Sequence, residues 1–162
     1  MRTYHNGDPV LGRLDDAWQT LQKLRALAEE WSEFHWELGR YYDARSDITN
    51  AVSEYRRAYE LEVEPRLKTI YQAWYLLRSG QTKELRALLD VEDTLPEFGQ
   101  NAIAVAQVYG MLGDLDQSFR WLEKARLSHN LPLMNIRLDP WHENIRSDPR
   151  YAELLEKLSV TS

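Results

Sequence analysis

The chain has 162 residues and carries 20 Lys and Arg against 26 Asp and Glu, a formal net charge of −6. With 43% hydrophobic and 28% charged residues, it has the composition of a folded globular protein, and its length allows one domain or a short array of repeats. The acidic balance argues against nucleic-acid binding, which needs a basic surface. The absence of cysteine excludes disulfides, thiol catalysis and cysteine-ligated metal sites.

The sequence shows no targeting or membrane-spanning segment. Residues 1–12 form a polar N-terminal segment without the apolar stretch of a secretory signal. No apolar run approaches the roughly 20 residues that a transmembrane helix needs. We therefore expect a cytoplasmic protein that does not bind a membrane.

Apolar residues recur with helical periodicity through most of the chain, and no stretch shows the alternation of a β-strand. Asp47, Thr82 and Asp114 are predicted N-caps, the last with Gln117 in a capping box. Asp148 precedes a proline that suits a first helical position. The sequence thus predicts an all-α fold with helices at residues 13–30, 33–45, 48–62, 66–79, 82–91, 98–112, 115–128 and 149–158.

The helices are organised in a repeat of about 34 residues. Small turn residues are separated by 34, 34 and 33 residues, at Gly12, Ser46, Gly80 and Gly113. Small residues also recur seven positions before three of these turns, at Gly39, Ala73 and Ala106. A small residue lets two helices cross closely, and glycine readily adopts the left-handed conformation that ends a helix. The pattern therefore predicts pairs of helices joined by tight turns.

A helix-turn-helix of this length resembles the tetratricopeptide repeat (TPR). The best copy matches at Ala106, Tyr109, Gly113, Ser118, Leu122 and Ala125. The resemblance covers about residues 12–127 and implies an α-solenoid of antiparallel helix pairs. Its domain at 13–128 would hold a half repeat at 13–31 and repeats at 32–65, 66–97 and 98–130. In the middle repeat Glu92 stands where a small residue is expected, so we expect a short second helix there.

Residues 131–162 are expected to form an extended segment and a C-terminal capping helix. One face of that helix is apolar, with Tyr151, Leu154, Leu155 and Leu158. A TPR followed by such a segment is similar to the C-terminal TPR regions of bacterial multidomain signalling proteins. This resemblance carries no catalytic residue over to the chain.

Motifs for catalysis, metal binding or phosphate binding are missing. There is no glycine-rich phosphate loop and no nucleophile elbow. The histidines lie far apart, without metal-site spacing, at His5, His35, His129 and His142. We therefore expect no enzymatic activity, no metal and no cofactor.

In the TPR family the first helix of each pair lines a concave groove. Transferring that register to this chain gives Trp36, Arg40, Asp43, Ile70, Trp74, Leu77, Arg78, Ile103, Gln107 and Met111. Two Trp, two Arg and several aliphatic side chains make up the composition of an interface core. TPRs that hold chaperone C-termini use Lys and Asn at groove positions, where this chain has Trp36, Arg40 and Tyr71. We therefore do not expect that carboxylate-clamp function.

The sequence predicts a non-enzymatic module that binds a peptide or helix of a protein partner in this groove. Trp36 and Trp74 would anchor apolar side chains, while Arg40 and Arg78 would pair with carboxylates. The alternative function is a structural or dimerisation arm, the C-terminal regulatory region of a larger bacterial signalling protein. A further alternative places the chain's own terminal helix or its 130–140 segment in the groove, which would bury both tryptophans.

Overall fold

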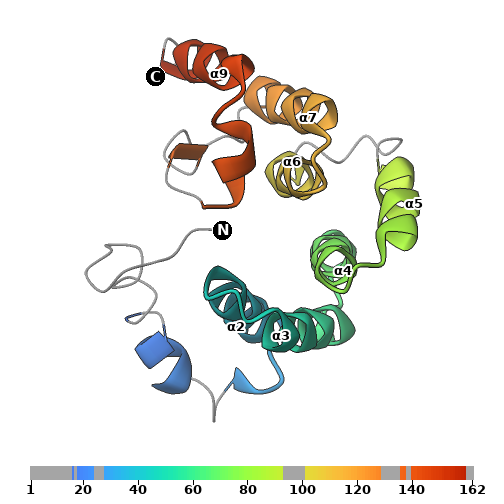
Figure 1. The fold of residues 1–162 in the computed structure, drawn as a ribbon. Helices are drawn as coiled ribbons and strands as arrows, with labels where there is room; N and C mark the ends of the chain where they lie inside the picture. The colour runs from blue at the N-terminus through green and yellow to red at the C-terminus, as the bar shows by residue number, and fades with distance from the viewer. Residues whose placement is uncertain are drawn as a thin grey trace. The chain divides into compact units, whose positions relative to one another are not determined.

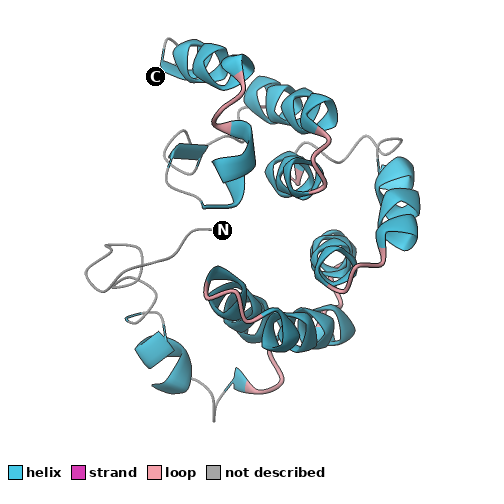
Figure 2. Cartoon of the chain, viewed as in Figure 1, coloured by secondary structure: helices cyan, strands magenta, loops and turns pink. Residues whose placement is uncertain are grey.

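Every regular element in the described part of the chain is a helix (Figure 1). The computed structural model describes residues 16, 18–23, 28–92, 101–128, 136–137 and 140–159. The elements are α2 (Ser32–Ala44), α3 (Ile48–Leu61), α4 (Pro65–Arg78), α5 (Thr82–Glu92), α6 (Ala102–Met111), α7 (Leu115–Leu127), the 3-10 helix η2 (Pro140–Ile145) and α9 (Pro149–Ser159). No strand occurs in these ranges (Figure 2), so the predicted all-α fold class is confirmed.

Two of the three predicted N-caps are confirmed. A side-chain oxygen of Asp47 accepts the backbone N–H of residue 50, and Asp114 does the same for residue 117, each at 3.3 Å. Thr82 is not a cap, because it is already the first residue of α5. Leu85 donates its backbone N–H to the carbonyl of Gln81, which therefore takes the capping position.

Proline begins two of the helices. Pro65 lies in the first turn of α4, where the missing N–H costs no helical hydrogen bond, and Glu64 caps that turn. Pro149 begins α9 in the same way, and Asp148 Oδ1 accepts the N–H of Arg150 at 3.0 Å. The C-terminal helix predicted from this Asp-Pro pair is confirmed.

Three of the predicted turn residues adopt the left-handed conformation. The φ angles are 74° at Gly80 and 79° at Gly113, as the helix-ending role of glycine requires. Ser46 takes the same conformation with φ at 61°, which is costly for a residue with a Cβ atom. Gly12 lies outside the described residues.

The chain divides into two compact units, residues 1–79 and 80–162. In the first unit, α2 packs along α3 and α3 packs along α4. The α2–α3 crossing depends on Gly39, where a Cβ atom would lie 2.7 Å from the ring of Tyr55. The small residue that the repeat pattern predicted at this position is therefore required by the packing.

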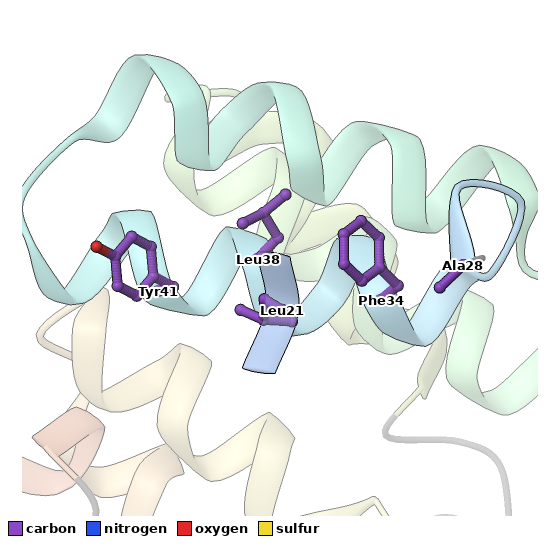
Figure 3. Close-up of a cluster of buried hydrophobic side chains, with 5 residues drawn as sticks. All are labelled: Leu21, Ala28, Phe34, Leu38 and Tyr41. Carbon is purple, nitrogen blue, oxygen red and sulfur yellow. The ribbon is translucent and has the colours of Figure 1, made fainter. Parts of the chain in front are cut away.

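The N-terminal end of the first unit has its own apolar core. Its buried members are Leu21, Ala28, Phe34, Leu38 and Tyr41 (Figure 3). Trp18 stacks on the ring of Tyr41, with a centroid distance of 4.7 Å. Residues that precede α2 thus supply apolar side chains that cover one face of that helix.

In the second unit, α6 packs against α7, and both η2 and α9 contact this pair. The hydroxyl of Ser118 donates to the carbonyl of Ala106 at 2.8 Å, beside the fully buried Trp121. The boundary between the units falls inside the expected repeat at 66–97. Within that repeat α5 is described from Thr82 to Glu92, and residues 93–100, where the short helix was expected to end, lie outside the described residues.

Residues 140–145, at the end of the expected extended segment at 130–140 and near Trp141, where the apolar periodicity of the sequence resumes, form the 3-10 helix η2. Residues 136–137 are helical as well, and Ile136 is fully buried. The polar segment at 1–12, His5 and His129 lie outside the described residues. Among the residues that the structure describes, no helix is both long enough and apolar enough to cross a membrane.

Candidate interaction surface

Seven of the ten predicted groove residues lie on α2 and α4 of the first unit. Five of them are partly exposed, namely Trp36, Arg40, Ile70, Leu77 and Arg78. The other two, Asp43 and Trp74, are buried, and only 2% of Trp74 is exposed. We use the name α2/α4 face for the partly exposed Trp36, Arg40, Ile70 and Leu77 together with Glu33 and Glu37 of α2, which are exposed.

Trp36 is held in place by three aromatic rings. It stacks on Tyr71, with a centroid distance of 4.7 Å and an interplanar angle of 22°. It meets Trp74 edge to face at 5.7 Å and Tyr55 at 5.3 Å. Such aromatic pairs contribute about 0.5–1.5 kcal/mol each beyond the area they bury. The Trp36 ring therefore links α2, α3 and α4 and is already ordered in the free chain.

Asp43 and Arg78 bind each other. Arg78 donates from Nε at 2.8 Å and from Nη2 at 2.7 Å to the same carboxylate oxygen of Asp43. The hydroxyl of Tyr55 donates to that oxygen as well, at 3.4 Å. Because the Asp43 side chain is only 2% exposed, removing either partner would leave a charge in a poorly solvated site. This pair therefore fixes α2 against α4.

The two buried tyrosines of this region stay protonated at neutral pH. Burial, followed by the charge of Asp43, raises the pKa of the Tyr55 hydroxyl far above its usual value. Burial also raises the pKa of Tyr71 to about 12, with further contributions from the charges of Glu62, Glu33 and Glu37. Three carboxylates thus lie close enough to Tyr71 to disfavour its ionised form.

Arg40 is less firmly engaged than Arg78. Its Nη1 lies 3.4 Å from Glu37 Oε1, three residues earlier on the same helix. Both side chains are well exposed, 33% for Arg40 and 49% for Glu37. An exposed pair of this kind contributes about 0.2–1 kcal/mol at most.

The remaining three groove residues, Ile103, Gln107 and Met111, lie on α6 of the second unit and are partly exposed. Gln107 Nε2 is 3.3 Å from Nε2 of His142, which belongs to η2 and is 1% exposed. Because an amide nitrogen only donates, the His142 nitrogen accepts this hydrogen bond. Element η2 therefore lies against the α6 face that carries Gln107.

A second contact fixes η2 on α6. Asn144 donates to the carbonyl of Gly110 at 3.3 Å. A Cβ atom at Gly110 would also lie 3.3 Å from the Ile145 side chain. Part of the α6 face is thus covered by η2, a different segment from the terminal helix and the 130–140 stretch that the sequence-based alternative placed in the groove. In the first unit, by contrast, Trp36 and Trp74 pack against rings of their own unit.

Two residues of this surface, Glu33 and Glu37, were not among the predicted groove positions, whereas the sequence had already placed Tyr71 at one. The two glutamates lie three residues before and one residue after Trp36, on the outer side of the same helix. Helical spacing from Trp36 could have indicated Glu33. The contribution of Tyr71 could not be predicted in this way, because it depends on how α4 packs beside α2.

Groups that could hold a metal ion do not occur within the described ranges. One open hollow in the second unit is lined by Arg86 and Arg150 together with Asp114 and Asp116. Arg150 pairs there with Asp116 at 2.7 Å and with Asp148 at 2.8 Å. Since the acidic residues already neutralise that guanidinium, the hollow has no excess of positive charge at Arg150.

No family model matches this chain. Comparison with curated proteins and with solved structures likewise finds no match. The resemblance to the TPR family, and to bacterial signalling proteins that contain it, therefore depends on the repeat residues alone and stays a prediction.

Proposed function

We propose that the chain is a TPR-like α-solenoid of antiparallel helix pairs that binds a peptide or helix of a protein partner and has no chemistry of its own. The observation that supports this function is the α2/α4 face. Large apolar side chains of Trp36, Ile70 and Leu77 remain partly exposed there, on the first helices of two successive pairs. Partly exposed aromatic and aliphatic residues of this kind commonly supply the anchors of protein interfaces.

The packing below the face also favours binding. Trp36 is stacked on Tyr71, and the buried Asp43–Arg78 pair joins the two helices. A partner that docks here therefore meets side chains whose conformational entropy has already been lost on folding. Arg78 is already paired with Asp43, so we do not assign it to a partner. The proposed binding by the face depends on its apolar residues and on its exposed charges.

The test is affinity capture from a lysate of the cells that make the protein. Ile70→Ser/Leu77→Ser removes apolar side chains of the face without opening the core, whereas Trp74→Ala would remove a buried residue. Ile48→Ser/Leu127→Ser is the matched control, since both residues are exposed and lie outside the face. Wild type and control should capture the same protein, and the face variant should lose it. Identical captures by all three chains would refute the proposal.

A second candidate function is the structural or dimerisation arm. The observation that favours it is an exposed apolar pair, Trp31 at 61% and Val63 at 88%. The two positions are brought near each other by a 2.6 Å hydrogen bond from the Ser32 hydroxyl to Glu62 Oε2. Sedimentation velocity should then show a dimer that dissociates in Trp31→Ser/Val63→Ser. A monomer at all concentrations would exclude this candidate.

A further inference from the structure

The outer side of α2 is acidic where it borders Trp36. Glu33 and Glu37 lie one helical turn apart on either side of this tryptophan, and both are exposed. Their charges act together on the hydroxyl of Tyr71, the residue on which Trp36 stacks. Glu33 is therefore a neighbour of Trp36 on the helix surface, and Glu37 follows one turn after Glu33 on the exposed side of α2.

The cations of α2 and α4 all have partners within the first unit. Arg66 pairs with Glu64 at 3.0 Å, and Lys68 donates to a carbonyl of the α3–α4 connection at 3.0 Å. Arg78 is held by the buried carboxylate of Asp43. Arg40 contacts Glu37 at 3.4 Å, so it offsets one of the two glutamates only in part. A carbonyl leaves the charge of Lys68 in place, but this ammonium lies over the ring of Tyr59 of α3, 5.3 Å from its centroid. The exposed acidic charges of α2 next to Trp36 in the sequence are those of Glu33 and Glu37, and Arg40 offsets the second of them in part.

The α4 side of the face is apolar. Ile70 and Leu77 are partly exposed there, and Leu67, which lies three residues before Ile70 and is 41% exposed, extends their apolar row beyond the α2/α4 face as defined above. An occupant must therefore offer apolar side chains to α4 and complementary charges to α2. An amphipathic helix with Lys or Arg along the edge of its apolar stripe offers both the apolar side chains and the positive charges.

We propose that the α2/α4 face binds a basic amphipathic helix, whose apolar stripe packs on Leu67, Ile70 and Leu77 and whose cations lie against Glu33 and Glu37. This inference rests on the proposed function, because it identifies the partner class of the same face. A cation beside Glu33 is also close to the ring of Trp36, which attracts positive charge through its π electrons. This proposal differs from the expectation from the sequence, in which Arg40 and Arg78 pair with carboxylates of the partner.

The experiment is isothermal titration calorimetry of the full chain with two synthetic 14-residue helical peptides. One contains Leu and Lys at amphipathic spacing, and the other has Glu at every Lys position. The face variant is Glu33→Gln/Glu37→Gln. Its matched control is Glu153→Gln/Glu156→Gln, which removes the same charge from exposed positions of α9 in the second unit. Both variants keep the helices, because glutamine has a helix propensity close to that of glutamate.

We expect the Lys peptide to bind the wild type and the control equally and the face variant about fivefold more weakly, the loss of two exposed ion pairs. Raising the salt concentration to 1 M should remove most of this difference, because salt screens exposed charges. The Glu peptide should bind none of the chains measurably.

The other outcomes separate the two proposals. Four results would overturn the inference of a basic partner. The Lys peptide could bind the face variant and the control equally weakly, or both as well as wild type. The Glu peptide could bind more tightly than the Lys peptide, or neither peptide could bind. The proposed function would survive these results if Ile70→Ser/Leu77→Ser still abolished capture of the natural partner. If that variant captured the partner as well as wild type, the proposed function itself would fail.

Discussion

His35 predicts a pH dependence of stability in the first unit. Its Nδ1 lies 2.6 Å from Glu54 Oε2 on α3, and its Nε2 lies 2.9 Å from the carbonyl oxygen of Glu29, which precedes α2. A carboxylate and a carbonyl only accept hydrogen bonds, so both ring nitrogens must carry a proton to satisfy these contacts. The geometry therefore favours an imidazolium that joins three segments of the unit.

The pKa of His35 follows from opposing effects. Burial lowers it, and the nearby Arg57 lowers it slightly. The hydrogen bonds to Glu54 and to the Glu29 carbonyl and the charge of Glu54 outweigh these effects, so the pKa of His35 is raised above 6.5. Because the pKa of His35 is higher in the folded state, protonation of His35 stabilises the fold fully below pH 6.5. This stabilisation is lost as the pH rises through the pKa of the folded state.

The perturbation that tests this account is Glu54→Gln. A hydrogen bond to a charged group contributes about 1.5–3 kcal/mol, and we expect the lower end because the Glu54 side chain is 23% exposed. Urea unfolding should show a loss of about 1.5 kcal/mol relative to wild type at pH 5.5 and a smaller loss at pH 8.5. Glu60→Gln, on the exposed side of α3, is the control and should change stability by less than about 0.5 kcal/mol.

NMR titration of the His35 ring provides the direct measurement. In wild type the pKa should lie above 6.5, and in Glu54→Gln it should fall because burial is then opposed only by the Glu29 carbonyl. A wild-type pKa below 6.5, or a destabilisation by Glu54→Gln that is the same at both pH values, would refute the reasoning.

Three further predictions concern the packing of the same unit. Gly39→Ala should destabilise the chain by about 1–3 kcal/mol in urea unfolding, because the added Cβ would lie 2.7 Å from the ring of Tyr55. An unchanged midpoint would show that this ring can move aside. Asp43→Asn should cost about 3 kcal/mol by the same assay, since it leaves Arg78 without its carboxylate while keeping the shape of the side chain. A loss below 1 kcal/mol would mean that the pair is solvated. Ser46→Gly should raise the free energy of unfolding by about 1 kcal/mol, because φ is 61° there. Thermal unfolding would contradict this last prediction if the variant melted at a lower temperature.

The helices were predictable because their signals are local. The caps at Asp47 and Asp114, the prolines that begin α4 and α9, and the glycines of the turns all act within a few residues of their own position. Apolar periodicity resumes near Trp141, but η2 was not among the predicted helices because six residues are too few to define a helix from periodicity. The Asp43–Arg78 pair was not predictable either. The two residues were both assigned to the groove, but whether they meet each other depends on how α2 packs beside α4.

The two units differ in what contacts the helices that carry the predicted groove residues. In the second unit the side chain of Gln107 contacts His142 of the chain's own η2, and Ile145 lies against Gly110. In the first unit the corresponding helices leave Trp36 and Ile70 partly exposed. Because η2 contacts α6 and α9 contacts α7, the helix pair of the second unit is partly covered by segments of the same chain. This contrast is the reason that the proposed partner site is the α2/α4 face of the first unit.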